Sequence, residues 1–342
     1  MDQFIETYCS CETSDKSNHI IEQHVNDILS KTMQPIFKKQ ALIHPNLARR
    51  HQSKYGSKCI DIHEDQQWKN DYCVELLFWL LDNISTDQLQ DNLHLFIPPV
   101  LIVLDDYDVE YKEQGVNMLH MMIHKLEPQY ISRFGLDNVF LESLFKCLSY
   151  LSQDRDVPLL RATYPCIMEL IATKKQSQAR LKLFERVLKE GVLTGFTYAG
   201  QKIKFLPILL KHISPLYDEI GSIGVQYLKA LVPTLCTTMS MISSNNPAIK
   251  EINKLAAASL TTVIKKCWPR IPLYRGLIMQ SLAKTWTYYY NKEGRYHINQ
   301  AILQTLKQLY QAFEAACQGQ EKADTETLLE YSPAVFEPLF FK

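Results

Sequence analysis

The sequence predicts an all-α protein, a HEAT- or armadillo-like α-solenoid of irregular helical hairpins. Three observations lead to this fold class. Apolar residues recur at helical spacing along the chain, whereas the strict alternation typical of strands is short and rare. Glycine supplies only 11 of the 342 residues, about half its usual share, so tight hairpins should be few. Two-helix units also follow one another at intervals close to those of HEAT or armadillo repeats.

The first 70 residues differ from the rest. We expect residues 1–70 to form a polar N-terminal leader with one or two marginal helices, because its apolar residues occur only in short clusters such as Ile20–Ile21 and Ile28–Leu29. Residues 71–342 are expected to form the HEAT-like solenoid, which ends in an apolar tail interrupted by prolines. The tail either caps the last repeat or docks into a partner, and capping is favoured because terminal repeats must cover their core.

Helical spacing is clearest where the leader ends. Positions i, i+3, i+4, i+7 and i+8 of one amphipathic helix face are occupied by Cys73, Leu76, Leu77, Leu80 and Leu81. The same spacing recurs at Leu141, Leu144, Phe145, Leu148 and Leu151, and again at Ile298, Ile302, Leu306, Leu309 and Phe313. A helical pair of this kind cannot bury its apolar stripe alone, so neighbouring pairs must stack into one continuous core.

Five two-helix units are expected, at intervals of roughly 35 to 50 residues. Their first and second helices cover residues 98–104 and 109–122, 144–151 and 158–170, 205–213 and 218–231, 232–242 and 248–268, and 271–286 and 298–317. The turn within the third unit is expected at Ser214–Pro215, and the turn within the fifth at residues 291–294.

The first unit carries a group of motif residues. Pro98–Pro99 is expected at a helix start, where the missing N–H costs nothing. Asp105 or Asp106 is expected to cap the second helix by accepting from its free N–H groups. Lys112 follows on that helix, and Gly115 stands where a small residue lets two helices approach closely.

Charge and cysteine usage exclude several classes of protein. Lys and Arg together number 37, as do Asp and Glu, so electrostatic capture of nucleic acid or of an anionic membrane is not expected. The longest apolar stretch, Leu95–Leu104, is too short to span a membrane. The nine cysteines are scattered singly, and their odd number argues against a secreted disulfide framework. We therefore expect an intracellular protein, located in the cytoplasm with the nucleus as a second location.

No catalytic, cofactor or metal site is predicted, and the chain is not expected to be an enzyme. It contains no G-x-S-x-G elbow, P-loop or dinucleotide fingerprint. His120 and His124 have the i, i+4 spacing that places two imidazoles on one zinc ion, but Met121 replaces the glutamate of metalloproteases and no third ligand lies nearby in the sequence. A metal enzyme using these two histidines and a third ligand remains a minor hypothesis.

Two other groupings have ordinary explanations. The acidic run Asp105, Asp106, Asp108 and Glu110 lacks the EF-hand spacing and is expected to serve a helix N-terminus. The second grouping, Cys9, Cys11, Cys59 and His63, lacks the spacing of a zinc knuckle, so these thiols are expected to be unliganded.

Aromatic residues are the candidates for partner binding. Three consecutive tyrosines on a helix span about 200° of arc, so at least one of Tyr288–Tyr290 should reach the surface unless it packs beneath a loop, and the two alternatives are equally favoured. Tyr and Trp are preferred interface anchors because they bury a large area with few rotatable bonds. The candidates are Trp268, Trp286, Tyr288, Tyr289, Tyr290, Phe336 and Phe340.

Four sequence blocks, in this order, carry a family resemblance. They are Ile97-Pro98-Pro99 with Asp105-Asp106-Tyr107, Tyr111-Lys112, Gly115 and Leu119; Arg133-Phe134-Gly135-Leu136-Asp137 with Val139-Phe140, Leu148 and Tyr150-Leu151; Leu159 to Pro165; and Gly221 with Gly224-Val225, Tyr227-Leu228 and Leu231-Val232-Pro233. Together they resemble the family of Tti two, the Tel-two-interacting protein two. The resemblance covers residues 95–235 and is absent from the leader.

The resemblance implies a non-enzymatic α-solenoid that is the small subunit of the TTT co-chaperone complex. Members of the family bind a large solenoid subunit, Tti one, and through it Tel two. The assembly works with heat-shock protein 90 and its adaptor R2TP in the maturation and stability of phosphatidylinositol 3-kinase-related kinases. The alternative is an unrelated helical-repeat adaptor or a transport-receptor fragment that binds protein partners, although transport receptors are usually strongly acidic and this chain is neutral.

Overall fold

The fold is known from a computed structural model that describes residues 16–41, 67–70, 72–132, 135–175, 177–243, 246–290 and 296–341. These residues form helices and turns without a strand, so the predicted all-α class is confirmed. None of the described helices is both long and apolar enough to cross a membrane. The chain divides into two compact units, one made of residues 1–150 and 158–174 and the other of residues 151–157 and 175–342.

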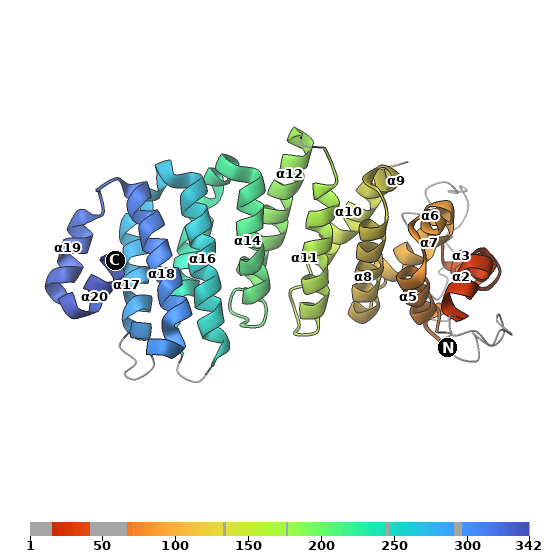
Figure 1. The fold of residues 1–342 in the computed structure, drawn as a ribbon, viewed down its shortest axis with the longest axis horizontal. Coiled ribbons are helices and arrows are strands. Elements are labelled where there is room, and N and C mark those ends of the chain that lie inside the picture. The colour runs from red at the N-terminus through yellow and green to blue at the C-terminus, as the bar shows by residue number, and fades with distance from the viewer. Residues whose placement is uncertain are drawn as a thin grey trace, which may run out of the picture. The chain divides into compact units, whose positions relative to one another are not determined.

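Unit 1 is built around the pair α7 and α8, with α5 packed on α8 and α3 on α7 (Figure 1). Its elements are α2 (Lys16–Asp27), the π-helical turn η1 (Ile28–Met33), α3 (Gln34–Ala41), α4 (Gln67–Asn70), α5 (Cys73–Asn83), α6 (Thr86–Asp91), α7 (Leu93–Leu104), α8 (Val109–Lys125), α9 (Pro128–Ser132), α10 (Leu136–Cys147) and, from Pro158 on, α11 (Asp156–Ala172).

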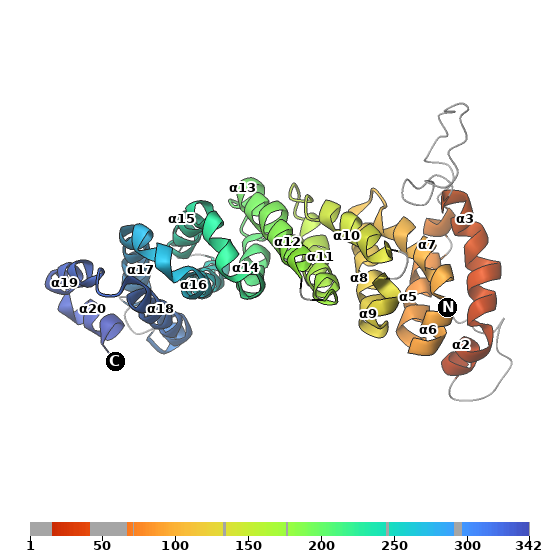
Figure 2. The same cartoon turned by 90° about the horizontal axis from the view of Figure 1, so that it is seen from above.

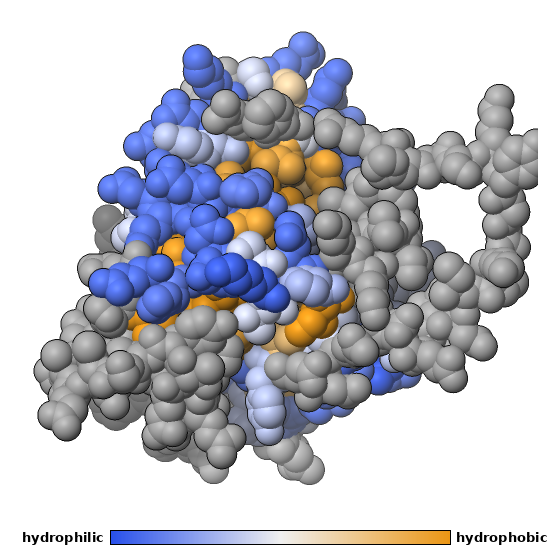
Figure 3. All heavy atoms as spheres, turned by 90° about the vertical axis from the view of Figure 1, so that its right-hand side faces the viewer, coloured by the Kyte–Doolittle hydropathy of each residue, from blue (hydrophilic) through white to orange (hydrophobic). Residues whose placement is uncertain are grey.

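The described helices of the expected leader are packed within unit 1. Ile20, Ile21, Ile28, Leu29 and Phe37 are all buried there, because α2 contacts α5 and α3 contacts α7. On the face formed by these first helices, apolar side chains reach the surface in separate places among polar ones (Figure 3). The extent of the leader, residues 1–70, stays a prediction.

Unit 2 has helices in two layers, with α15 and α17 in one and α14, α16 and α18 in the other (Figure 2). Its elements are α12 (Gln178–Arg186), the π-helical η4 (Val187–Leu193), α13 (Thr194–Ala199), α14 (Leu206–Ile220), the 3₁₀-helical η5 (Gly221–Tyr227), α15 (Leu228–Met239), α16 (Ala248–Cys267), the 3₁₀-helical η6 (Trp268–Tyr274), α17 (Arg275–Tyr290), α18 (Tyr296–Cys317), α19 (Lys322–Tyr331) and α20 (Pro333–Phe340).

Four of the five predicted two-helix units correspond to consecutive helices, α7–α8, α10–α11, α15–α16 and α17–α18, and the residues placed at helical spacing in α5 and α10 are buried. The third predicted unit is wrong, because residues 205–213 and 218–231 are not two helices of one hairpin: α14 covers Leu206–Ile220, and η5 and α15 follow it. The predicted turn at residues 291–294 lies outside the described residues.

Three predictions about proline were wrong. Pro98 and Pro99 lie inside α7, which begins five residues before Pro98 at Leu93, and Pro233 lies inside α15. No turn interrupts the chain at Ser214–Pro215, because α14 runs through it. An interior proline costs about 3 kcal/mol through a lost hydrogen bond and a clash. In α7 that cost is offset by burial of all five residues from Val100 to Leu104.

The cap of α8 was also predicted wrongly. Asp108, rather than Asp105 or Asp106, is the N-cap, and its carboxylate accepts from the Glu110 N–H at 3.1 Å. Asp106 lies one step earlier and accepts from the Asp108 N–H at 2.8 Å. It therefore orders the turn that presents the cap.

Lysine side chains of α8 donate hydrogen bonds to backbone carbonyl groups at the C-terminal ends of α5 and α7. Lys125, at the end of α8, donates to the carbonyls of Leu81, Asp82 and Ile84 at 2.6 to 3.0 Å, and these are the last carbonyls around α5. Lys112 is buried and donates to the Leu104 carbonyl at the end of α7 at 2.9 Å. These ammonium groups satisfy carbonyls that lack an intrahelical partner and oppose the negative end of the helix dipole.

Gly115 sits where α7 and α8 approach most closely. A Cβ added there would lie 2.4 Å from both Cα and N of Leu104, atoms of the α7 backbone that cannot rotate away. The short distance between α7 and α8 therefore requires a residue without a side chain at position 115.

We expect Gly115→Ala to lower the melting midpoint measured by circular dichroism, because α7 and α8 must move apart, and overpacking of this kind costs about 1–3 kcal/mol. Gly276→Ala is the matched control, since a Cβ at this helical glycine would meet nothing within 4 Å. It should keep or raise the midpoint. Equal midpoints for the two variants would show that the α7–α8 contact does not depend on Gly115.

Candidate functional site

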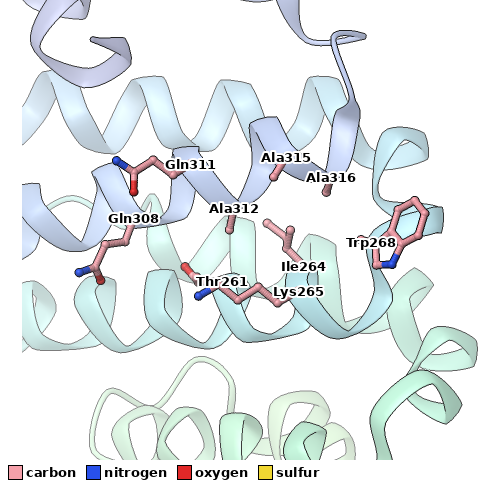
Figure 4. Close-up of a pocket in the computed structure, with 9 residues that line it drawn as sticks. All are labelled: Thr261, Ile264, Lys265, Trp268, Gln308, Gln311, Ala312, Ala315 and Ala316. Atoms are coloured by element: carbon pink, nitrogen blue, oxygen red, sulfur yellow. The ribbon is translucent and has the colours of Figure 1, made fainter. Parts of the chain in front are cut away.

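A groove lies between α16 and α18 in unit 2 and has a volume of about 660 Å³ (Figure 4). The small side chains of Ala312, Ala315 and Ala316 leave space along α18. Polar and charged side chains border it, and Trp268 stands at one end. The lining residues are Thr261, Ile264, Lys265, Trp268, Gln308, Gln311, Ala312, Ala315 and Ala316.

Trp268 is held at the groove by the chain reversal after α16. The α-helix ends at Cys267, and Pro269 and Pro272 follow within the 3₁₀ turn η6, where the missing N–H groups prevent an α-helix from continuing. Trp268 is 49% exposed, although tryptophan, as a large apolar residue, is on average well buried. Trp268 therefore presents an apolar surface beside the cation of Lys265.

The other aromatic candidates on α17 pack mainly inside the protein. Trp286 is buried, stacks on Tyr290 with ring centroids 5.4 Å apart, and donates from Nε1 to the Val335 carbonyl at 2.8 Å. Tyr289 is also buried and its hydroxyl accepts from Nδ2 of Asn253 at 3.1 Å, while burial raises its pKa to about 12. Tyr288 is half-buried and donates to the Ser243 carbonyl at 3.1 Å.

The apolar tail forms α20, which lies against α17 and α18. Phe336 is buried, and Phe340 packs on Tyr310 with ring centroids 4.7 Å apart. Of the seven candidates, Trp286, Tyr289 and Phe336 belong to the interior of unit 2, and Trp268 is the most exposed. Partner contact by this group stays a prediction, and Trp268 is the residue placed to make it.

A second cluster in unit 1 includes Asp106, Tyr107 and Tyr111, residues of the first sequence block. The ammonium of Lys69 lies 2.8 Å from Oδ1 of Asp106 and within 4.3 to 5.1 Å of the ring centroids of Trp68, Tyr107 and Tyr111. The ion pair with Asp106 and the cation–π contacts with Tyr107 and Tyr111 fasten α4 to the α7–α8 turn and to the first turn of α8. Lys69 was not recognised from the sequence, because its partners Asp106, Tyr107 and Tyr111 follow it by more than thirty residues.

The structure brings a third side chain to the two histidines of α8. The carboxylate of Glu169, on α11, lies 2.8 Å from Nε2 of His120 through one oxygen and 3.0 Å from Nδ1 of His124 through the other. Sequence spacing identified the histidine pair but missed Glu169, because only the packing of α11 beside α8 brings it there. The metal-like group Cys9, Cys11, Cys59 and His63 lies outside the described residues.

The described cysteines are poorly suited to nucleophilic chemistry. All six are buried, and burial raises the pKa of Cys147, Cys236, Cys267 and Cys317 to about 11. A thiol with so high a pKa forms little thiolate at neutral pH.

Comparison with known proteins gives one consistent family. The sequence profile of the Tti2 family matches residues 1–243. TELO2-interacting protein 2 of mouse and of rat is 22% identical over 226 residues, and the human protein is 20% identical over 236 residues. Each match covers 64% of this chain and 43% of the relative, so the chain spans less than half of the length of these relatives. No solved structure matches the chain.

We expect Trp286→Phe to loosen α20, because the variant loses the hydrogen bond to Val335 and part of a buried ring, a change of about 1–3 kcal/mol. Hydrogen exchange of the α20 amides should accelerate. Tyr288→Phe is the control, since its hydroxyl bonds to Ser243 and not to the tail. Unchanged exchange in α20 of Trp286→Phe would mean that Trp286 does not hold the tail.

Proposed function

Because the chain belongs to the Tti2 family, we propose that it is a non-catalytic scaffold subunit of a complex like TTT. In this proposal it binds a large α-solenoid subunit resembling Tti one and, through it, a subunit resembling Tel two. The assembly acts with heat-shock protein 90 and R2TP in the maturation and stability of phosphatidylinositol 3-kinase-related kinases.

The family match over residues 1–243 carries this proposal. The curated relatives are named for an interaction with TELO2, which supports a partner of that kind here. Stacked helical hairpins also favour binding over catalysis, because they offer long, rigid surfaces to other proteins. The groove at Trp268 lies beyond residue 243, so its use as a contact is a separate part of the proposal.

Co-expression of the tagged chain with a large Tti one-like subunit tests the proposal. Size-exclusion chromatography with light scattering should give a one-to-one complex that survives moderate salt, because a scaffold contact buries apolar surface as well as charge. Elution of two separate species would overturn it. If the chain instead bound a small GTPase or transport cargo, the alternative function would be favoured, that of an unrelated helical-repeat adaptor or transport-receptor fragment.

Trp268→Ala is expected to weaken this complex by about 2 kcal/mol, roughly thirtyfold in Kd, since exposed tryptophans beside a groove act as anchors. Leu273→Ala is the matched control, because Leu273 is 75% exposed on the same turn but does not line the groove. Biolayer interferometry with the purified partner measures both. Equal affinities for the two variants would show that the partner does not bind at the groove.

A further inference from the structure

His120, His124 and Glu169 form a compact group of metal-ligand atoms in unit 1. The histidines stand one turn apart on α8, with ring centroids separated by 4.5 Å, and Glu169 faces them from α11. One ligand atom from each of the three residues can be chosen so that all lie within 4.8 Å of one another. Their side chains are 24%, 60% and 36% exposed, which leaves a path for an ion to enter.

The donor set suits zinc. Zinc in proteins is bound by imidazole nitrogens and carboxylate oxygens, and sites with three protein ligands keep a water in the fourth position. Histidines at i and i+4 on a helix place two imidazoles on one ion. Here the two oxygens of one carboxylate already lie 2.8 and 3.0 Å from the two imidazole nitrogens, so little movement is needed to place an ion among them.

We propose that His120, His124 and Glu169 bind one divalent transition-metal ion of the Zn²⁺ class. The ligand atoms are Nε2 of His120, Nδ1 of His124 and a carboxylate oxygen of Glu169, and water completes the coordination. In this site the ion links α8 to α11, whose side chains already meet here through the contacts of Glu169 with the two histidines. The role is structural, and the inference stands independently of the proposed scaffold function.

Titration of the metal-free full chain with Zn²⁺, followed by isothermal calorimetry, tests the site. The wild-type chain should bind one equivalent more than Glu169→Gln and His120→Ala, or bind that equivalent at least about tenfold more tightly, because even residues that only orient metal ligands contribute that much to affinity. This difference also separates the site from any zinc bound by cysteines elsewhere. His94→Ala is the matched control, since His94 is an exposed histidine on α7 outside the group, and it should bind zinc as the wild type does.

A spectroscopic readout identifies the ligands directly. Co²⁺ in a four-coordinate site of nitrogen and oxygen ligands absorbs visible light strongly, and the band should appear in the wild type and in His94→Ala but not in Glu169→Gln. Zinc should also raise the melting midpoint of the wild type more than that of His124→Ala. Identical zinc stoichiometry, affinity and cobalt spectra in the wild type and Glu169→Gln would overturn the proposal and leave the three residues as a hydrogen-bonded cluster.

Discussion

Burial of apolar helix faces against neighbouring helices is the constraint on which the rest of the structure depends. In unit 2, α16 contacts α14, α15 and α18, and its buried positions recur on several sides of the helix, from Ile249 through Ala256 and Leu260 to Val263. No single hairpin could cover that surface, so each pair is stable only as part of a stack. The same constraint explains the interior prolines, because the apolar residues that follow Pro99 gain more by burial than the helix loses.

Stacking also decides where polar groups go. The ends of α5 and α7 leave carbonyl groups without partners, and Lys125 and Lys112 supply donors from later in the chain. Lys202 likewise donates to the carbonyls of Leu151 and Ser152, in the segment between α10 and α11. Burial lowers the pKa of Lys125, yet its ammonium still has three carbonyl partners. These lysine–carbonyl contacts fix each turn to the neighbouring helix. The outer faces of the helices are not used in them and can form surfaces such as the groove at Trp268.

Sequence periodicity was enough to predict four of the five helical pairs, because the apolar face of each helix is encoded within a few consecutive turns, but it divided α14 at Ser214–Pro215. It misplaced helix boundaries wherever a proline suggested a start, as at Pro98 and Pro233, since tertiary packing outweighs local preference there. Contacts between distant residues were not predictable from spacing. The contact of Lys69 with Asp106 and that of Glu169 with the two histidines depend on which helices become neighbours. A local sequence pattern carries no information on that.

We propose that this chain works by binding a larger solenoid subunit rather than by catalysis. The decisive experiment is affinity capture of the tagged chain from its native source at moderate salt, with mass spectrometry of all retained proteins. We predict recovery of a large Tti one-like solenoid subunit, a Tel two-like subunit and giant kinases, the first in amounts equal to the chain itself. Recovery of the chain alone, or only of transport cargo, would contradict it.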